Sequence, residues 1–139
     1  MTDDALRARI RRSFEQQGLM RTLGATLAHV EPGRVRVEAQ VTEASSQQQG
    51  AGHAGLTFAL ADSAAGYAAL TLMDPDAEVV TSEFRISLLA PARGQLVAEG
   101  RVLRPGRRLI AVAADVYGDD GAHVATALGT MVPVRASLV

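Results

Sequence analysis

The segment from Gly52 to Met73 constrains the fold of this 139-residue chain more than any other feature. It reads GHAGLTFALADSAAGYAALTLM, the length of one long helix, and Pro75 prevents the helix from continuing. Small and apolar residues lie on every side of such a helix, so one flat sheet would leave part of it in water. We therefore expect a curved sheet, or a sheet together with a second copy of the chain, to enclose it.

Asp62 lies in the middle of this apolar segment and is its sole carboxylate. Lone carboxylates are rarely buried without a partner, because removing an ionised group from water is costly. A helix with such a residue usually uses it for chemistry, or a partner chain compensates its charge. Two structural alternatives stay open, in which Asp62 caps a break in the helix or pairs with an arginine of another chain.

The expected start of the helix has features of a binding site for a developing negative charge. His53 lies there, flanked by glycines at 50, 52 and 55. The first N–H groups of a helix have no partner within it and favour negative charge. The N–H groups of Ala54 and Gly55 are therefore candidates to hold a thioester carbonyl as it becomes an oxyanion, with Asp62 as nucleophile or general base. The alternative is that His53 only caps or packs against the helix.

His53 and Asp62 cannot meet at one substrate atom if both belong to the same helix. Nine helical steps separate them by roughly 13–14 Å along the axis and place them on nearly opposite faces. Either one of the two residues is structural, or the site combines the helix start of one chain with the carboxylate of another. A twofold dimer with antiparallel helices side by side would create two such sites.

The remaining sequence predicts one α+β domain over residues 1–139. An apolar stripe of Leu6, Ile10 and Phe14 predicts an N-terminal amphipathic helix over 4–17. Asp3 or Asp4 is expected to cap its start, and Gly18 to end it in the left-handed region. Alternating residues predict strands before and after the long helix, and the turns between them are rich in glycine and proline. These strands are expected over residues 25–30, 35–41, 79–89, 95–103, 109–117 and 123–134. We expect them to form a curved antiparallel sheet wrapped around the long helix.

Composition and motifs exclude several kinds of site and partner. The chain has no cysteine, which rules out disulfides, thiolate metal sites and cysteine nucleophiles. Its three histidines lack metal-ligand spacing and no glycine-rich nucleotide loop is present, so we expect no metal and no resident cofactor. The net charge of −1 gives no general attraction to nucleic acid or acidic membranes. The charged N-terminus lacks the apolar run of a secretory signal, so we expect a cytoplasmic protein.

Arginines gather around one turn of the expected sheet. They are either a solvated hairpin tip or a clamp for the phosphates of a nucleotide-bearing ligand such as coenzyme A. The cluster consists of Arg101, Arg104, Arg107 and Arg108, with Arg93 on the preceding turn. Four side chains are our candidates for coenzyme A binding on this basis, together with Gln48 from the polar loop before His53. They are Arg85, Arg104, Arg107 and Arg108.

The segment Gly52-His53-Ala54-Gly55 followed by Leu60-Ala61-Asp62 resembles the His-Gly-Gly…Leu-Ala-Asp signature of PaaI-type hotdog-fold acyl-CoA thioesterases. The resemblance extends over most of the chain, including the strand at 81–89, the Pro-Gly-Arg turn at 105–107 and the end of the last strand. It implies a long helix wrapped by an antiparallel sheet. It also implies two chains joined into a continuous sheet, often paired again into a tetramer, with active sites between chains.

The resemblance also implies roles for individual residues. Asp62 would be the catalytic carboxylate, and Ala54 would donate its backbone N–H to the thioester oxygen. Thr81 matches the hydroxyl residue that orients water or the carboxylate, and His53 would be a supporting polar residue. The Pro-Gly-Arg turn lies near where such proteins receive the coenzyme A phosphates.

Two positions depart from the family pattern. Ala54 replaces the usual glycine, which keeps the backbone donor but adds a methyl group near the thioester. Gln47 replaces the usual asparagine six residues before the histidine, and Gln48 or Gln49 takes its role if the loop is shifted. These departures bear on rate and substrate range more than on fold.

The leading hypothesis is therefore a homo-oligomeric hydrolase of a small acyl- or aryl-coenzyme A, either a dimer or a dimer of dimers. A non-catalytic acyl-coenzyme A binding or regulatory module on the same fold is the main alternative. A hotdog dehydratase is less favoured, because the motif and spacing are those of the thioesterases. The sequence leaves the acyl group and the pathway open.

Overall fold

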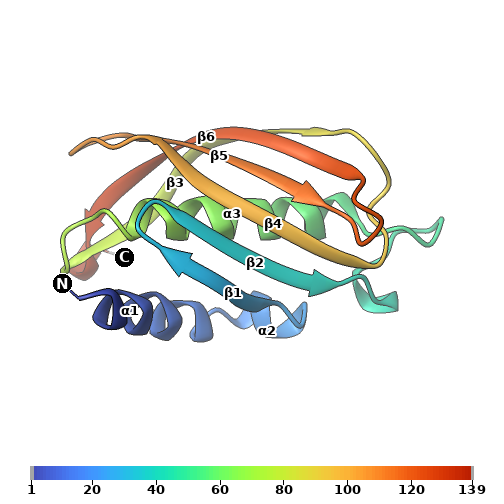
Figure 1. Ribbon diagram of the computed structural model, residues 1–139, viewed down its shortest axis with the longest axis horizontal. Helices are drawn as coiled ribbons and strands as arrows, with labels where there is room; N and C mark the ends of the chain where they lie inside the picture. The colour runs from blue at the N-terminus through green and yellow to red at the C-terminus, as the bar shows by residue number, and fades with distance from the viewer. Residues whose placement is uncertain (1, 139) are drawn as a thin grey trace.

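The computed structural model describes residues 2–138 as three α-helices, two short 3₁₀-helices and six strands (Figure 1). The N-terminal part contains α1 (Asp3–Glu15), α2 (Gly18–Thr22), β1 (Thr26–Glu31), β2 (Arg34–Gln40) and η1 (Glu43–Ser45). The central helix is α3 (Ala54–Leu70). The C-terminal part contains β3 (Ala77–Leu88), β4 (Gln95–Arg104), β5 (Ile110–Tyr117), β6 (His123–Arg135) and η2 (Ala136–Leu138). The order of helices and strands is the one expected, except for the added short helices.

All six strands form one antiparallel sheet in the order β1-β2-β4-β5-β6-β3. Figure 1 shows this sheet curving around α3, with α1 and α2 beside the β1 edge. The expected hotdog architecture, a long helix wrapped by a curved sheet with an added N-terminal helix, is confirmed. No helix of the described residues is long and apolar enough to cross a membrane.

Small residues let α3 approach the sheet closely. The helix is rich in buried alanines, and Gly100 of β4 lies directly against the backbone of Ala64. A Cβ atom at position 100 would overlap that backbone, so only glycine fits there. The larger core side chains, such as Leu60, Leu96 and Met131, fill the space on either side.

The N-terminal helix differs from the expectation at both ends. The sequence left Asp3 or Asp4 as the N-cap, but Thr2 is the cap, and its hydroxyl accepts a bond from the Ala5 N–H. We also expected Gly18 to end the helix in the left-handed region. Instead the helix ends at Glu15, and Gly18 begins α2 without a positive φ. The buried stripe of Leu6, Ile10 and Phe14 is as expected.

Arg9 joins α1 to the C-terminal end of α3. Its guanidinium donates hydrogen bonds to the carbonyl oxygens of Leu70 (3.4 Å), Met73 (3.2 Å), Asp74 (2.7 Å) and Ala77 (2.9 Å). The last carbonyls of a helix lack partners within it, and a cation there also complements the helix dipole. One side chain therefore caps α3 and fixes the start of β3.

The chain leaves one stripe of α3 and one sheet edge uncovered. Gly55 and Phe58 on this stripe are exposed, and Ala59, Asp62 and Ser63 are half-buried. The β3 edge is long, and most of its residues are exposed. Long exposed strand edges are sites at which another strand can pair. The expectation that one sheet face alone cannot cover α3 therefore agrees with the structure.

Candidate functional site

Asp62 lies half-buried on the uncovered stripe of α3 and is hydrogen-bonded to β3. The Thr81 hydroxyl donates to its Oδ1 at 2.8 Å. Burial raises the pKa of the Asp62 carboxyl above its ordinary value, and the hydrogen bond from Thr81 partly opposes this rise. The β3 strand has a register shift between Thr81 and Glu83, which sets Thr81 toward the helix opposite Met131. The expected pairing of Thr81 with this carboxylate is present.

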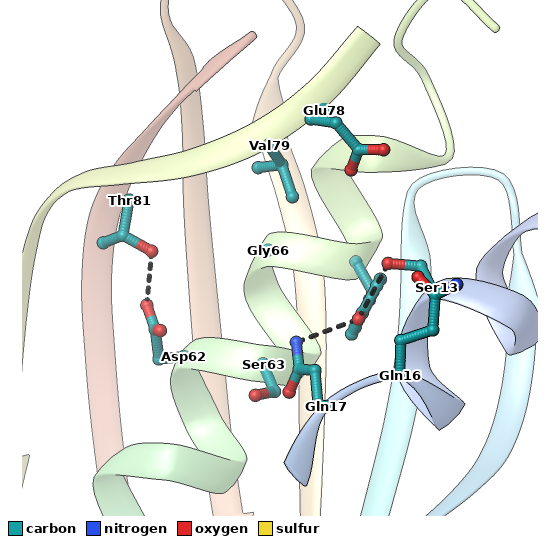
Figure 2. Close-up of a pocket in the computed structure, with 10 residues that line it drawn as sticks. Ser13, Gln16, Gln17, Asp62, Ser63, Gly66, Glu78, Val79 and Thr81 are labelled. Atoms are coloured by element: carbon teal, nitrogen blue, oxygen red, sulfur yellow. Dashed lines mark hydrogen bonds between the residues drawn. The ribbon is translucent and has the colours of Figure 1, made fainter. Parts of the chain in front are cut away.

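Asp62 opens into a cavity of about 700 Å³ between α1, α3 and the start of β3. Figure 2 shows its walls, with Asp62 and Thr81 at one end and α1 side chains at the other. Most of the lining side chains are polar, and these are Ser13, Gln16, Gln17, Asp62, Ser63, Tyr67, Glu78 and Thr81, with Gly66 and Val79 completing it. Such a concave site with convergent polar groups and a carboxylate of raised pKa is a candidate active site.

Tyr67 forms the far wall of this cavity together with Ser13 of α1 and Gln17, which lies between α1 and α2. Its buried hydroxyl lies 3.0 Å from Ser13 Oγ and accepts a hydrogen bond from Gln17 Nε2 at 2.9 Å. Burial raises the pKa of the Tyr67 hydroxyl, so it is neutral at ordinary pH. The sequence did not single out these three residues. Two features of the sequence could have pointed to them: the i, i+4 spacing of Ser13 and Gln17, and the presence of a tyrosine in an apolar helix.

His53 is the N-cap of α3, which is the structural alternative that its position left open. Its Nδ1 accepts a 2.7 Å hydrogen bond from the Gly55 N–H, so the ring occupies one of the two N–H groups proposed for the oxyanion. The Gly55 N–H is therefore engaged by His53 in this structure, and its donation to a substrate carbonyl stays a prediction. The Ala54 N–H has no hydrogen-bond partner within residues 2–138 and points out of the helix start.

The helix start borders a second cavity of about 390 Å³. Four residues singled out from the sequence lie together there: Gln47, Gln48, His53 and Ala54. The opposite wall is the chain after β3, including Leu88 and residues 90–92. The side-chain oxygen of Gln47 accepts a hydrogen bond from the Gln49 N–H, so the Gln47 side chain is fixed by its own loop.

These two cavities share no lining residue, which agrees with the separation computed from nine helical steps. Within one chain, Asp62 and Thr81 belong to the first cavity, and His53 and Ala54 to the second. The half-buried stripe of α3 that joins them is the surface left uncovered by the chain.

The arginine candidates lie away from both cavities. Arg104 at the end of β4 is exposed, as are Arg107 and Arg108 in the turn between β4 and β5. Arg107 borders a small cavity beside Leu72–Asp74, at the opposite end of α3 from His53. Arg101 is hydrogen-bonded to Asp115 at 2.8 Å and is not a free member of the clamp.

Arg85 lies on the outer face of the edge strand β3. It is exposed, whereas its neighbours Phe84 and Ile86 pack against the core. Because side chains alternate along a strand, Arg85 points away from Asp62 of its own chain. Within residues 2–138, no group of three or more histidine or acidic side chains is placed to hold a metal ion.

Comparison with known proteins gives consistent results. Residues 49–125 match the model of the thioesterase superfamily. A solved thioesterase family protein from Silicibacter pomeroyi has a TM-score of 0.90 and 36% sequence identity, covering 94% of this chain and 99% of that one. The E. coli PaaI protein of the phenylacetic acid degradation operon has a TM-score of 0.85 at 21% identity, covering 93% of each chain, which shows a shared fold. The 1,4-dihydroxy-2-naphthoyl-CoA hydrolase of Listeria monocytogenes is 35% identical over 80 residues, 58% of this chain and 65% of that protein.

Proposed function

The chain belongs to the thioesterase superfamily and is a thioester hydrolase, and from this premise we propose that it cleaves a small acyl- or aryl-coenzyme A at a site built around Asp62. The coenzyme A thioester is supported by the related naphthoyl-CoA hydrolase. The observation that carries the proposal is the Asp62–Thr81 pair at one end of the polar cavity of about 700 Å³.

Asp62 supplies the base or the nucleophile. As a base, it takes a proton from water while the water oxygen attacks the thioester carbon; the C–S bond then breaks and the departing thiolate takes a proton. As a nucleophile, its carboxylate attacks the thioester carbon, the C–S bond breaks and the thiolate leaves as a mixed anhydride forms; water then opens the anhydride, which releases the acid and restores the carboxylate. In either case the ionised carboxylate is required. Its raised pKa makes the ionised carboxylate a better proton acceptor than that of an exposed aspartate.

The Ala54 N–H is the oxyanion donor in this proposal. It is unpaired within residues 2–138 and lies at the start of a 17-residue helix, where the dipole favours negative charge. His53 does not donate to substrate through Nδ1, because that atom caps the helix. His53 acts by capping α3 and so fixing the conformation of the helix start. Gln47 and Gln48 line the same cavity.

A second copy of the chain completes the site. Asp62 and Ala54 of one chain lie in separate cavities, and both border the stripe of α3 that the chain leaves uncovered. Pairing of two β3 edges would bring two α3 helices together in antiparallel directions and cover both stripes. Each carboxylate would then face the partner's helix start. The exposed arginines 85, 104, 107 and 108 would lie on the rim, available to coenzyme A phosphates, and two dimers would associate as a tetramer.

Thiol release from a panel of acyl- and aryl-coenzyme A thioesters tests this function. The purified full chain should release free coenzyme A from at least one member. Asp62→Asn should lower turnover at least about 100-fold, because it removes the proton acceptor. Asp76→Asn, the same change in an exposed loop, is the matched control and should keep wild-type turnover.

Two results would contradict the proposal. Saturable binding of the thioesters without thiol release would identify the chain as a binding or regulatory module. Wild-type turnover in Asp62→Asn would leave hydrolysis in place and remove Asp62 from the mechanism.

A further inference from the structure

The cavity beside Asp62 is lined by many polar side chains as well as by apolar surface. Binding pockets for apolar groups are mostly lined by apolar side chains. Here Val79 and Gly66 are the apolar members, and the rest of the lining carries hydroxyl, amide or carboxylate groups. An alkyl group in this space would remove those groups from water without replacing their hydrogen bonds, which is unfavourable.

One of these groups is a hydrogen-bond acceptor held in a fixed position. Gln17 donates its Nε2 to the Tyr67 hydroxyl at 2.9 Å, and its backbone N–H donates to the Phe14 carbonyl at 3.1 Å. The Gln17 Oε1 atom has no hydrogen-bond partner within residues 2–138. Figure 2 shows Gln17 on the cavity wall opposite Thr81.

The charges in the cavity restrict the ligand further. Asp62 and Glu78 both line it, and its described lining contains no lysine, arginine or histidine. A carboxylate on the acyl group would meet two like charges with no cation to compensate it. A neutral hydrogen-bond donor faces no such penalty.

The geometry points to Gln17 as a specificity-determining residue: its Oε1 accepts a hydrogen bond from a hydroxyl group at the far end of the acyl or aryl group, while Tyr67 and Ser13 hold it in place. This inference rests on the proposed function, since it takes the reacting carbonyl to lie beside Asp62. Tyr67 is five helical residues from Asp62, about 7.5 Å along the axis. A hydroxylated ring or a chain of medium length spans that interval.

The test compares acyl groups of equal length that differ at the far end. Hexanoyl-, 6-hydroxyhexanoyl- and adipoyl-CoA present a methyl, a hydroxyl and a carboxylate group. Phenylacetyl- and 4-hydroxyphenylacetyl-CoA give the same comparison on a ring. In the wild type, kcat/KM for the hydroxylated member of a pair should exceed that of its partner by about tenfold, the effect of one hydrogen bond in a desolvated site. Adipoyl-CoA should be hydrolysed more slowly than hexanoyl-CoA.

Three variants assign the preference to Gln17. Gln17→Leu keeps a half-buried side chain of similar size and should reduce the ratio between hydroxylated and unhydroxylated substrates to about one, by lowering kcat/KM for the hydroxylated member of each pair. Tyr67→Phe removes the group that holds Gln17 and should lower the ratio without abolishing hydrolysis. Gln40→Leu, the same change at the exposed end of β2, should leave the ratio unchanged.

Three results would each overturn the inference while leaving the hydrolase activity in place. They are equal rates for the paired substrates in the wild type, a preference for adipoyl-CoA, and a hydroxyl preference that survives in Gln17→Leu. Absence of thiol release from every thioester would instead refute the proposed function, and with it this inference.

Discussion

The Thr81 hydroxyl donates a 2.8 Å hydrogen bond to Oδ1 of Asp62, and this bond connects the edge strand β3 to the middle of α3. Burial makes the ionised form of Asp62 less favourable, and the bond from Thr81 makes it more favourable. Thr81 therefore sets how basic the carboxylate is as well as where it points. The edge strand that would pair with a second chain also carries the residue that controls the carboxylate.

Thr81→Val should move the acid limb of the pH–rate profile to higher pH. Removing the hydroxyl removes the interaction that lowers the pKa of Asp62, and desolvation, which raises it, remains. In the wild type, kcat/KM should fall as pH drops through the raised pKa of the carboxyl, because the protonated form cannot act as base. The measurement is kcat/KM over the acid range for wild type and variant.

The control for this prediction is Thr26→Val, the same change at an exposed position of β1. Its acid limb should coincide with that of the wild type. A limb that moves to lower pH in Thr81→Val would show that the hydroxyl does not stabilise the carboxylate.

Asp62→Asn should raise the free energy of unfolding at neutral pH while it lowers turnover. The pKa of this carboxyl is higher in the folded than in the unfolded chain, so its contribution to stability is fully present below the unfolded value, about 3.9, and is lost as pH rises through the folded value. Asparagine stays neutral and keeps an oxygen to accept from Thr81. Urea unfolding across this range should show the two proteins converging at acid pH and the variant more stable at pH 7. A variant less stable than wild type at pH 7 would contradict the sign of the shift.

Ala54→Pro should abolish the oxyanion donor without disturbing the helix. Ala54 is the first residue of α3, where proline is well tolerated because its missing N–H would have no helical partner. The preceding residue, His53, has φ −63° and ψ 146°, which is the conformation that a following proline requires. We expect kcat to fall about 100- to 1000-fold, as for loss of one oxyanion donor, with circular dichroism and melting temperature close to wild type. Unchanged kcat in a folded Ala54→Pro variant would exclude this N–H from catalysis.

Mixing Ala54→Pro with Asp62→Asn should restore activity that neither variant has alone. If each site takes its carboxylate from one chain and its helix start from the other, a mixed dimer has one site with both defects and one intact site. Random exchange of subunits should therefore recover about a quarter of wild-type activity. Absence of recovery after verified subunit exchange would place both groups of a site in one chain.

Local patterns sufficed to predict most of the fold, but the site was only partly predictable. The turn at Pro32-Gly33 was predictable because Gly33 needs a positive φ, which few other residues adopt. The separation of His53 from Asp62 followed from helical geometry alone. The bond between His53 and the Gly55 N–H was not predictable, because a histidine at a helix start can turn its ring either toward the backbone or toward solvent. The wall formed by Ser13, Gln17 and Tyr67 depends on where α1 packs, which sequence spacing does not specify.

Arg9→Leu should destabilise the fold by about 2–3 kcal/mol with little effect on the chemistry. The substitution leaves the carbonyls of Met73 and Asp74 without their charged donor at the end of α3. Arg11 is exposed and lies on a different face of α1 from Arg9. Arg11→Leu, the control, should change the free energy of unfolding by less than about 0.5 kcal/mol. Urea unfolding of both variants measures the difference. Equal stability of the two would show that water replaces the Arg9 hydrogen bonds at no cost.

Alanine substitutions at Gly66 and Gly100 should have opposite effects on stability. A Cβ at Gly66 would meet only the Met131 side chain, at 3.9 Å, and glycine in a helix interior costs about 0.5–1 kcal/mol relative to alanine. Gly66→Ala should therefore be more stable by about that amount. A Cβ at Gly100 would overlap the Ala64 backbone, so Gly100→Ala should be destabilised by about 1–3 kcal/mol.

Gly66 also lines the cavity that holds Asp62, which gives the Gly66→Ala variant a second readout. The added methyl group narrows the cavity. In Gly66→Ala, kcat/KM for the bulkiest acyl substrate should therefore fall about tenfold, which is the effect of one carbon atom in a close-fitting pocket. The fall in kcat/KM should be less for the smallest substrate. Thiol release across a series of acyl lengths measures this change of selectivity. An equal loss for all acyl lengths would show that the methyl group acts on the carboxylate, and an unchanged profile would place the acyl group elsewhere in the molecule.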